Sequence, residues 1–512
     1  MANLTKTAED LISDLADTLD VPPSRYESAE RSYKSVSDWL DRPGSRFAST
    51  TFNVYIQGSF RLGTAIRPFD GREDYDLDIV CEFSKNKLLT TQKKLFDDLG
   101  YELGLYSDAH SMETPAGWDR CWTLNYADEA QFHMDLLPCV PDGQRQRRLR
   151  VEASLSQAFV EKSVSITDKQ HPNYVRLTDD WPVSNPNGYA EWFYERMKTT
   201  FEAKRRAMML MEKRASVAEI PAFRVKTPLQ AAIQILKHHR NVRFSEDADG
   251  RPTSIVISTL AAAAYQQEAN ITGALLSILT RMEDYIKVRN GQYWIPNPSD
   301  PRENFADAWK DEPKRKDAFY DWLETVRADF NTAAEQNDIE GFIEALSPRI
   351  GRDILEKAAR RRHRALLEKS LVRKSAGALQ RILDAPHRKP IIWPKVPYGA
   401  VNIVSALVER DGFRPTPFES NGPAVPKNVK LKFVAETDVL RPFKVYWQVV
   451  NTGVEARNAN QLRGRFEETA IEEGRLVRRE PTRFKGTHSI QCFIVKDGYC
   501  VGWSDPFLVN IA

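Results

Sequence analysis

No run of apolar residues in this sequence is long enough to cross a lipid bilayer. The most apolar segment, Ile255 to Tyr265, is much shorter than the roughly 20 residues that a spanning helix needs. The first residues, MANLTKTAEDLISDLADTLD, are polar and acidic, unlike a secretory signal. We therefore expect a cytoplasmic protein with no membrane partner.

Cysteine is scarce, and charge of one sign is not in excess. The five cysteines are an odd number without CxxC spacing, which argues against a disulfide framework or a zinc site and fits a reducing compartment. The formal net charge is only +2, so the surface is not built for indiscriminate binding to nucleic acid. A chain of 512 residues should divide into two or three domains.

The sequence does contain a pair of carboxylates inside a predicted strand, DYDLDIV. Successive side chains of a strand alternate between its faces, so Asp76 and Asp78 project together. Tyr75, Leu77 and Ile79 point the other way, into a core. Neighbouring carboxylates repel each other, and Mg²⁺, which prefers hard oxygen ligands and also binds substrate phosphates, is the cation that best neutralises them. By itself a DxD is also common in surface turns and calcium-binding loops.

A third carboxylate lies on a second predicted strand, Gln131 to Val140. Asp135 falls on the less apolar face of this strand, opposite Phe132 and Met134. Three carboxylates can hold two metal ions about 4 Å apart, which activate an attacking hydroxyl and stabilise a leaving pyrophosphate. The three aspartates together predict a nucleotidyltransferase.

The turn before the first strand completes this pattern. Gly58 permits a close approach of the backbone, and Ser59 opens a predicted short helix, Phe60 to Ile66, whose free amides can bind a triphosphate. The alternative is that Ser59 only caps this helix.

The segments QGSFRLGT, DYDLDIV and HMDLLPCVPD resemble the CD-NTases, the bacterial cyclic-oligonucleotide synthases of CBASS anti-phage defence. These enzymes are relatives of animal cGAS and oligoadenylate synthase. Further segments similar to SMODS-type members of this family are SNPNGYAEWF, TPLQAAIQILKHHR, TSIVISTLAAAAY and NPSDPRENFADAW. The resemblance covers most of residues 40 to 310.

The resemblance implies a two-lobed, polymerase-β-like nucleotidyltransferase core with a helical lobe. Asp76, Asp78 and Asp135 would be the catalytic metal ligands, holding two Mg²⁺ ions, with Mn²⁺ as an alternative. The nucleotide contacts that it implies are Gln57, Gly58, Ser59, Ser184, Asn185, Lys237 and Arg240. Lys237 has an ordinary alternative as a solvated residue near a helix end. His238 and His239 are adjacent on a helix, point in different directions, and are expected to be structural.

Sequence patterning divides the chain into four parts, which together predict an α+β protein. Two helices are expected within residues 5 to 42, a mixed α/β core from about 50 to 180, and mainly helices from 188 to 383, interrupted by a loop at 295 to 301. Short alternating runs after the proline-rich segment indicate a β-sandwich. We expect a core at 1–200, a helical lobe at 201–385, a linker at 386–397 and a sandwich at 398–512.

A basic stretch runs from Lys357 to Lys374 within one predicted helix. One reading is an activator-binding surface for nucleic acid. The other, which we favour, is a solvated helix face, because no aromatic side chains interleave the charges to stack on bases. The question whether a nucleic acid acts as activator or primer therefore stays open.

The final domain resembles the sensor domain attached to some SMODS-type synthases, through VYWQVVNTG, LRGRF and GTHSIQCFIVKDG. The resemblance implies a nucleotide or another ligand. Trp447 and Trp503 are candidates for stacking on a base, and Arg463, Arg465 and His488 are candidates for phosphate contacts. Each has an ordinary alternative: a tryptophan on a strand is usually core, and an arginine here has Glu467 as a ready partner.

These observations predict an enzyme that makes a cyclic di- or trinucleotide second messenger from NTPs and releases pyrophosphate. A separate effector protein would read the product, because no effector domain is recognisable in the chain. The alternatives are a synthase of linear oligonucleotides, an enzyme that nucleotidylates a nucleic-acid or protein hydroxyl, and a nucleotide-binding regulator with a vestigial core. The bases and the 2′ or 3′ linkage are not encoded in these motifs.

Overall fold

The computed structural model describes residues 4–512 except 69–74, 127–131, 213–220 and positions 247, 397, 411 and 473; at 365–378 and 381 it describes the backbone alone. The chain separates into two compact units, Met1–Arg362 and His363–Ala512. Helices make up 42% and strands 24% of the structure, which confirms the predicted α+β class. No helix in the described part is long and apolar enough to cross a membrane.

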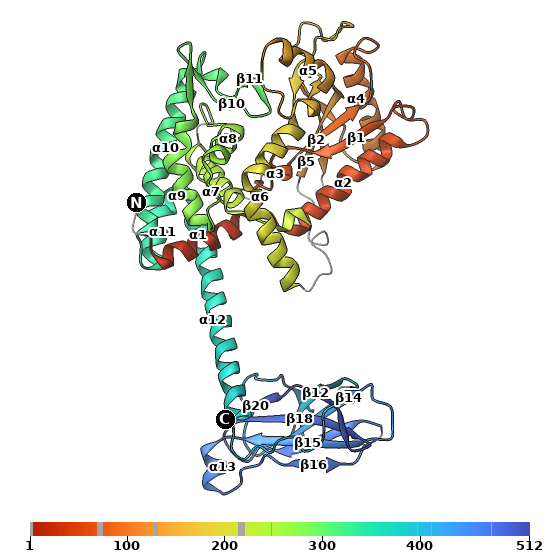
Figure 1. Cartoon of the computed structure of the whole chain (residues 1–512), viewed down its shortest axis with the longest axis vertical. Coiled ribbons are helices and arrows are strands. Elements are labelled where there is room, and N and C mark those ends of the chain that lie inside the picture. Colours follow the sequence, from red (N-terminus) through yellow and green to blue (C-terminus); the bar gives the residue numbers. More distant parts are fainter. Residues whose placement is uncertain are drawn as a thin grey trace. The chain divides into compact units, whose positions relative to one another are not determined.

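The first unit contains the sheet on which the candidate site is built (Figure 1). Its strands follow the order β1-β2-β5-β4-β3, with β6 beside β5 and β7 beside β6. Their bounds are β1 Phe52–Ile56, β2 Tyr75–Phe83, β3 Ala116–Gly117, β4 Trp122–Tyr126, β5 Phe132–Pro141, β6 Val164–Ile166 and β7 Val183–Ser184. β2 and β5 are parallel, whereas the other pairs in this sheet are antiparallel. The two central strands therefore run side by side in one direction.

The two predicted N-terminal helices are present, but they join different layers. α2 (Pro23–Asp41) and α4 (Gln92–Ala109) pack their apolar side chains with the inward residues of β2 and β5. α1 (Lys6–Leu19) instead buries its leucines among the helices that follow the sheet. The N-terminus thus helps to build the helical lobe.

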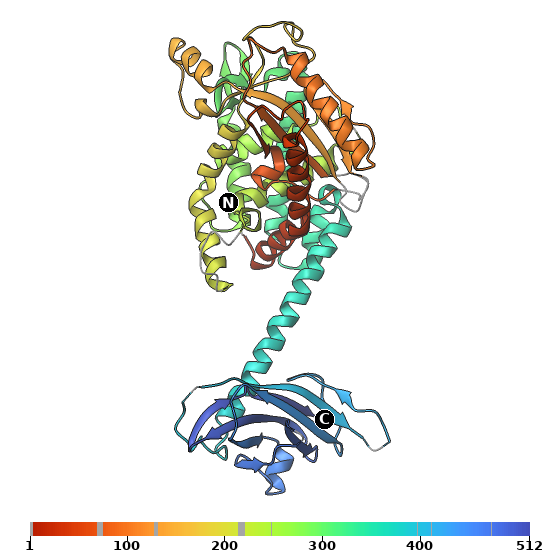
Figure 2. The ribbon, with the colours of Figure 1, turned by 90° about the vertical axis from the view of Figure 1, so that its right-hand side faces the viewer.

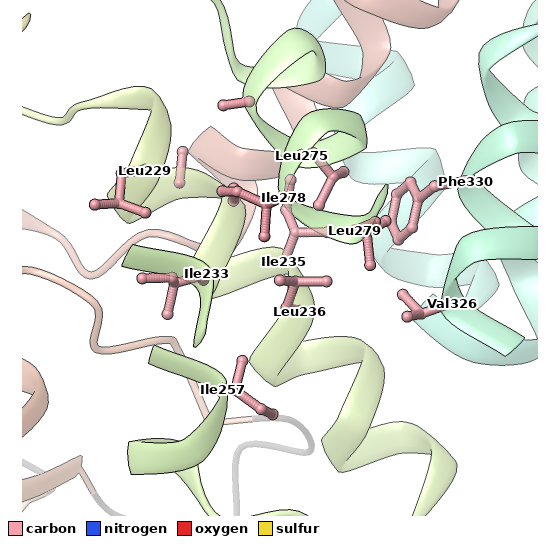
Figure 3. Packing of buried hydrophobic residues seen from close by; sticks show 14 of the residues in the cluster. Leu229, Ile233, Ile235, Leu236, Ile257, Leu275, Ile278, Leu279, Val326 and Phe330 are labelled. Atoms are coloured by element: carbon pink, nitrogen blue, oxygen red, sulfur yellow. The ribbon is translucent and has the colours of Figure 1, made fainter. Parts of the chain in front are cut away.

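The helical lobe is arranged around one almost fully buried helix, α7 (Pro228–Arg243). Ile233, Ile235 and Leu236 point from α7 toward different neighbours, including α8 (Ser254–Ala264), α9 (Ile271–Arg281) and α10 (Pro313–Ala334), as Figure 3 shows. The buried polar side chains of α7 have hydrogen-bond partners: Gln230 donates to the carbonyl oxygen of Leu62, and Gln234 to that of Ala65. The remaining helices of the lobe are α6 Pro186–Met211, α11 Ile339–Ile350 and α12 Arg352–Leu383.

Two local predictions differ from the structure. The short helix expected at Phe60 to Ile66 is α3, Gly58–Leu62, because left-handed Gly63 ends it early. The loop expected at 295–301 contains a small ribbon of β10 (Pro296–Asn297) and β11 (Asp300–Asn304). A second small ribbon, β8 Lys287–Arg289 with β9 Gln292–Trp294, precedes it. The short helix α5, Gly143–Glu152, follows β5.

The second unit is a sandwich of two antiparallel sheets (Figure 2). One sheet has the order β13-β12-β14-β17, and the other has β16-β15-β18-β19 with β20 beside β18. The bounds are β12 Val401–Glu409, β13 Thr416–Pro417, β14 Lys430–Thr437, β15 Lys444–Asn451, α13 Val454–Asn458, β16 Phe466–Thr469, β17 Leu476–Pro481, β18 Gly486–Lys496, β19 Tyr499–Trp503 and β20 Phe507–Ile511. Inward side chains of both sheets, including Phe433, Trp447 and Ile490, form its core.

Candidate active site

The parallel pair β2 and β5 brings the three predicted carboxylates together. Leu77 and Ile79 are fully buried, so the alternation of β2 turns Asp76 and Asp78 to the opposite face. Asp135 lies directly beside Asp78 in the register of the two strands. One face of two adjacent strands therefore carries all three aspartates.

Gly58 holds the preceding turn against this face. Its backbone has φ +60°, and a Cβ atom built on it would lie 1.9 Å from Asp78 Oδ2. The backbone amide of Gln57 donates a hydrogen bond of 2.8 Å to the carbonyl oxygen of Asp78. Only glycine combines this left-handed conformation with so close an approach to a carboxylate. Ser59 lies inside the first turn of α3, and Gln57 occupies the cap position, so Ser59 is not the cap.

The positive charges near the three carboxylates are too few to offset the repulsion between them. Burial, together with repulsion from Asp76 and Asp135, raises the pKa of Asp78 to about 7, although Lys237 and His133 oppose the shift. A cluster of this kind is unfavourable when ionised and fits divalent cations, which supply the missing charge. The residues present thus suit the metal chemistry that the sequence predicts.

The structure adds His133 to the cluster, which the sequence did not single out as a site residue. Ligand atoms of Asp76, His133 and Asp135 all lie within 4.8 Å of one another. The Nε2 atom of His133 is 3.4 Å from Asp76 Oδ1, and the two residues are direct neighbours in the register of β2 and β5. The HMD spacing places His133 on the face of Asp135, which was the available signal. Imidazole nitrogen is a ligand of transition-metal ions, whereas Mg²⁺ prefers hard oxygen ligands.

A second residue missed in the sequence positions Asp135. Thr123 on β4 donates a hydrogen bond of 2.5 Å to Asp135 Oδ1 and is its partner in the antiparallel register. The indole Nε1 of Trp118 donates in turn to Thr123 Oγ1 at 3.0 Å. Asp135 is therefore oriented from a strand that carries no other obvious site residue.

Lys237 faces the carboxylates from the helical lobe. It is only 6% exposed, which excludes the solvated alternative, and its Nζ donates to the carbonyl oxygen of Thr64 at 3.0 Å. Burial and repulsion by Arg240 lower the pKa of Lys237 to about 8, while Asp78 and Asp76 oppose the shift. A cavity of about 340 Å³ is lined by residues of both lobes, among them Gly58, Ser59, Asp76, Asp78, Lys237 and Arg240.

Arg240 contributes to the same cavity but is also a structural residue. Its Nη1 donates to the carbonyl oxygen of Pro252 at 2.7 Å and to Ser254 Oγ at 3.2 Å, which ties α7 to the start of α8. The two neighbouring histidines are structural, as expected. His239 bonds to Asp329 and accepts from Trp322, and His238 bonds to the carbonyl oxygen of Ile350.

Ser184 and Asn185 are not among the residues that line this cavity. The Asn185 side chain caps α6 by accepting from the Gly188 amide at 2.9 Å, and it donates to the carbonyl oxygen of Phe159 at 2.8 Å. It is 3% exposed, and both ends of its amide group are already hydrogen-bonded within the protein. We therefore assign Asn185 a structural role, because cap geometry explains its polarity.

A buried arginine connects α5 to the ribbon of the helical lobe. Arg150 is fully buried, and its Nη2 donates to the carbonyl oxygen of Ser299 at 2.8 Å and lies 3.3 Å from Asp300 Oδ2. This contact joins α5 to the helical lobe through residues that do not line the cavity beside the carboxylates. A buried polar contact therefore connects the two parts of the first unit.

Four described residues of the basic helix face lie beside carboxylates, and Lys357 is the first of them, 3.6 Å from Asp353. Arg361 and Arg362 bond to Asp17 and Asp10 of α1, and Arg360 lies 3.6 Å from Glu356. This agrees with a solvated helix face. The side chains of Lys369, Arg373 and Lys374 lie outside the described residues.

The candidate ligand residues of the sandwich have mostly structural surroundings. Trp447 is fully buried in the core, so it cannot stack on a base from solvent. Trp503 lies under Lys395, whose Nζ is 4.8 Å from the ring centroid. Arg463 forms ion pairs with Glu467 and Glu480. The pair with Glu467 is the structural alternative that the sequence suggested. Arg465 is exposed, and only Arg463 and His488 line a cavity together.

Two family models match the chain. Residues 6–161 match the Second Messenger Oligonucleotide or Dinucleotide Synthetase domain (SMODS), and residues 384–512 match the Adenylyl/Guanylyl and SMODS C-terminal sensor domain. The first contains all three aspartates of the cluster. The second coincides with the sandwich.

Two curated proteins are similar over most of their length. A c-di-GMP synthase of Roseivirga ehrenbergii is 26% identical over 72% of this chain and 90% of its own. The cyclic dinucleotide synthase CdnG of Bradyrhizobium diazoefficiens is 25% identical over 64% of this chain and 76% of its own. The solved structure of that CdnG with GTP has a TM-score of 0.54 and 20% identity, covering 70% of this chain and all of the other, which shows a common fold.

Proposed function

Because the chain belongs to the CD-NTases, with a SMODS nucleotidyltransferase domain and a C-terminal sensor domain, we propose that it makes a cyclic oligonucleotide from NTPs. The product would be a cyclic di- or trinucleotide second messenger, formed with release of pyrophosphate. The observation that carries this proposal is that Asp76, Asp78 and Asp135 share one face of β2 and β5. Asp76 and Asp78 line a cavity there together with Gly58 and Lys237.

Asp76 and Asp78 would hold both cations, and Asp135 the catalytic one. We propose two Mg²⁺ ions, with Mn²⁺ as a substitute that His133 favours. When bound, such ions activate the attacking hydroxyl and neutralise charge on the leaving pyrophosphate. Divalent-metal use is general in this family, and the low positive charge around Asp78 supports it here.

The remaining residues of the cavity would position the reactants. Lys237 supplies a buried cation, which is worth more to a triphosphate in a desolvated cleft than in water. Ser59 would donate its hydroxyl to a phosphate oxygen, since its position inside α3 leaves it on the cavity wall. Asp135, oriented by Thr123, would receive the proton of the attacking hydroxyl.

GTP is the first substrate to test. The relatives named above are a c-di-GMP synthase and a CdnG whose structure contains GTP. A separate effector protein would read the product. We also propose the four-part division at 1–200, 201–385, 386–397 and 398–512, in which the last part regulates the first two.

The experiment is to incubate the purified protein with each labelled NTP and dNTP, singly and in pairs, with Mg²⁺ or Mn²⁺, and to resolve the products after phosphatase treatment. A phosphatase-resistant cyclic product supports the proposal. A ladder of linear oligomers or labelled protein would replace it with the corresponding alternative. The control carries Asp76→Ala with Asp78→Ala, and a matched variant carries Asp97→Ala, an exposed carboxylate of α4 that pairs with Lys93.

A further inference from the structure

A cavity opens between the two sheets of the C-terminal sandwich. Its volume is about 340 Å³, within the range of small-molecule sites. Its interior is formed by inward side chains of both sheets: Leu431, Phe433, Val449, Ile490, Val509 and Ile511. Polar side chains line the rest of the cavity, among them Asn451, Gln461 and Ser489, so a ligand that fits it combines an apolar body with polar groups.

The charged groups at the mouth largely compensate one another. Arg463 lies 2.7 Å from a carboxylate oxygen of Glu467 and 2.5 Å from one of Glu480, and Arg478 pairs with the same two carboxylates. An arginine held by two carboxylates has no free edge for a phosphate. The mouth is consequently less suited to a polyphosphate, and the pairing of Arg463 agrees with the alternative role given for it above.

His488 supplies a hydrogen-bond acceptor at the wall of the cavity. It is 8% exposed, and its Nε2 lies 3.0 Å from the carbonyl oxygen of Phe484. Nε2 must donate in this contact, so in the neutral ring Nδ1 is an acceptor. Burial lowers the pKa of His488, which favours the neutral ring. In the described part of the chain Nδ1 has no hydrogen-bond partner.

Arg483 supplies a positive charge at the mouth. It is exposed, lines the cavity, and forms no ion pair with any residue that the structure describes. Among the arginines around this mouth, Arg463 and Arg478 are already neutralised. One negative group on a ligand would therefore be matched by Arg483.

We propose that this cavity binds an amphiphilic small molecule with an apolar body, one hydrogen-bond donor and a single negative group. The apolar body would lie between the sheets, the donor would meet His488 Nδ1, and the anion would meet Arg483. The site lies in the second unit and uses no residue of the catalytic cleft, so the proposal does not depend on the reaction. It differs from the nucleotide ligand that the family resemblance implies.

A suitable probe is 8-anilinonaphthalene-1-sulfonate, which has one N–H donor, one sulfonate and a fused aromatic body. The full-length protein should bind it with enhanced fluorescence. Val449→Phe should remove most of this signal by filling the cavity, and Arg483→Gln should weaken binding about three- to fivefold at low salt. The matched controls are Val404→Phe, at an exposed position of β12, and Arg414→Gln, an exposed arginine that does not line the cavity.

Two results would overturn the proposal. One is probe binding that both cavity variants leave unchanged, which would mean binding elsewhere only. The other is displacement by ATP of the fluorescence that depends on Val449, which would mean that polyphosphates enter the cavity. Arg483→Gln changes an exposed side chain and leaves the core intact. It therefore tests whether the probe binds at this cavity even if Val449→Phe fails to fold.

Discussion

Gly58 shows how one residue without a side chain can determine the geometry of the carboxylate cluster. Its left-handed backbone places the turn directly on Asp78, and the amide of Gln57 is bonded to the strand at the same point. Any Cβ would have to displace the Asp78 carboxylate. The position is therefore constrained by the site as well as by the conformation of the turn.

We predict that Gly58→Ala abolishes most product formation. The added methyl group would move Asp78 out of line with Asp76 and Asp135, and displacement of a metal ligand by about 1 Å typically costs about a hundredfold in rate. The measurement is kcat with saturating NTP. The control is Gly44→Ala, which has a similar left-handed φ of +87° but no atom within 4 Å of the added Cβ. Equal activity in the two variants would contradict the prediction.

Asp78 should make the metal-free protein less stable as the pH rises. Its pKa is raised from the ordinary value of 3.8 for an aspartate to about 7 in the folded state, so the folded protein binds the extra proton between these values. Stability is consequently lost as pH increases through this window, and it is fully present below it. Metal ions should reverse the effect by neutralising the carboxylate.

We expect Asp78→Asn to have a higher Tm than the wild type at pH 8 in EDTA, and a similar Tm at pH 4. In a large unit, each kcal/mol shifts Tm by about 2 to 4 °C. Thermal melts across this pH range would measure the difference. A constant difference at every pH would mean that ionisation of Asp78 is not the cause.

At the scale of elements, the faces of β2 and β5 could be predicted, while their exact ends and their surroundings could not. Alternation alone predicted that Asp76 and Asp78 share one face of β2 and that Asp135 lies on the less apolar face of β5, because a strand has only two faces. Register is set by pairing across the chain, so the contacts of Thr123 and His133 with these aspartates became visible only in the structure. The capping role of Asn185 was not visible in the sequence, because a polar residue looks alike there whether it caps a helix or binds a ligand.

The contact between α5 and the β10–β11 ribbon was equally hidden, because it joins residues 149 positions apart. We predict that Arg150→Met destabilises the first unit by about 3 kcal/mol, since it leaves Asp300 and several buried carbonyl oxygens with fewer donors. Chemical denaturation would measure this loss. Arg148→Met, at an exposed position of the same helix, should change stability by less than about 0.5 kcal/mol. Comparable losses in both variants would refute a specific role for Arg150.

At the scale of the whole molecule, the chemistry and the sandwich belong to separate compact units. We predict that a chain ending at residue 390 still binds NTP and forms phosphodiester bonds, with an altered basal rate. All residues of the carboxylate cluster and its cavity precede residue 260. The assay is product formation with labelled NTP, and the same shortened chain carrying Asp135→Ala is the blank. A shortened chain that is folded and binds NTP yet never reacts would show that the sandwich helps to build the active site.

The parallel pairing of β2 with β5 also determines when the active site can form during translation. Parallel neighbours need a crossover connection, here the segment that contains α4, so Asp78 and Asp135 cannot meet until that whole segment has emerged. Lys237 comes about a hundred residues later, on a helix that is stable only when the surrounding core has closed around it. A nascent chain shorter than the end of α7 therefore has no complete cleft, and messenger synthesis must wait until translation has passed well beyond the carboxylates.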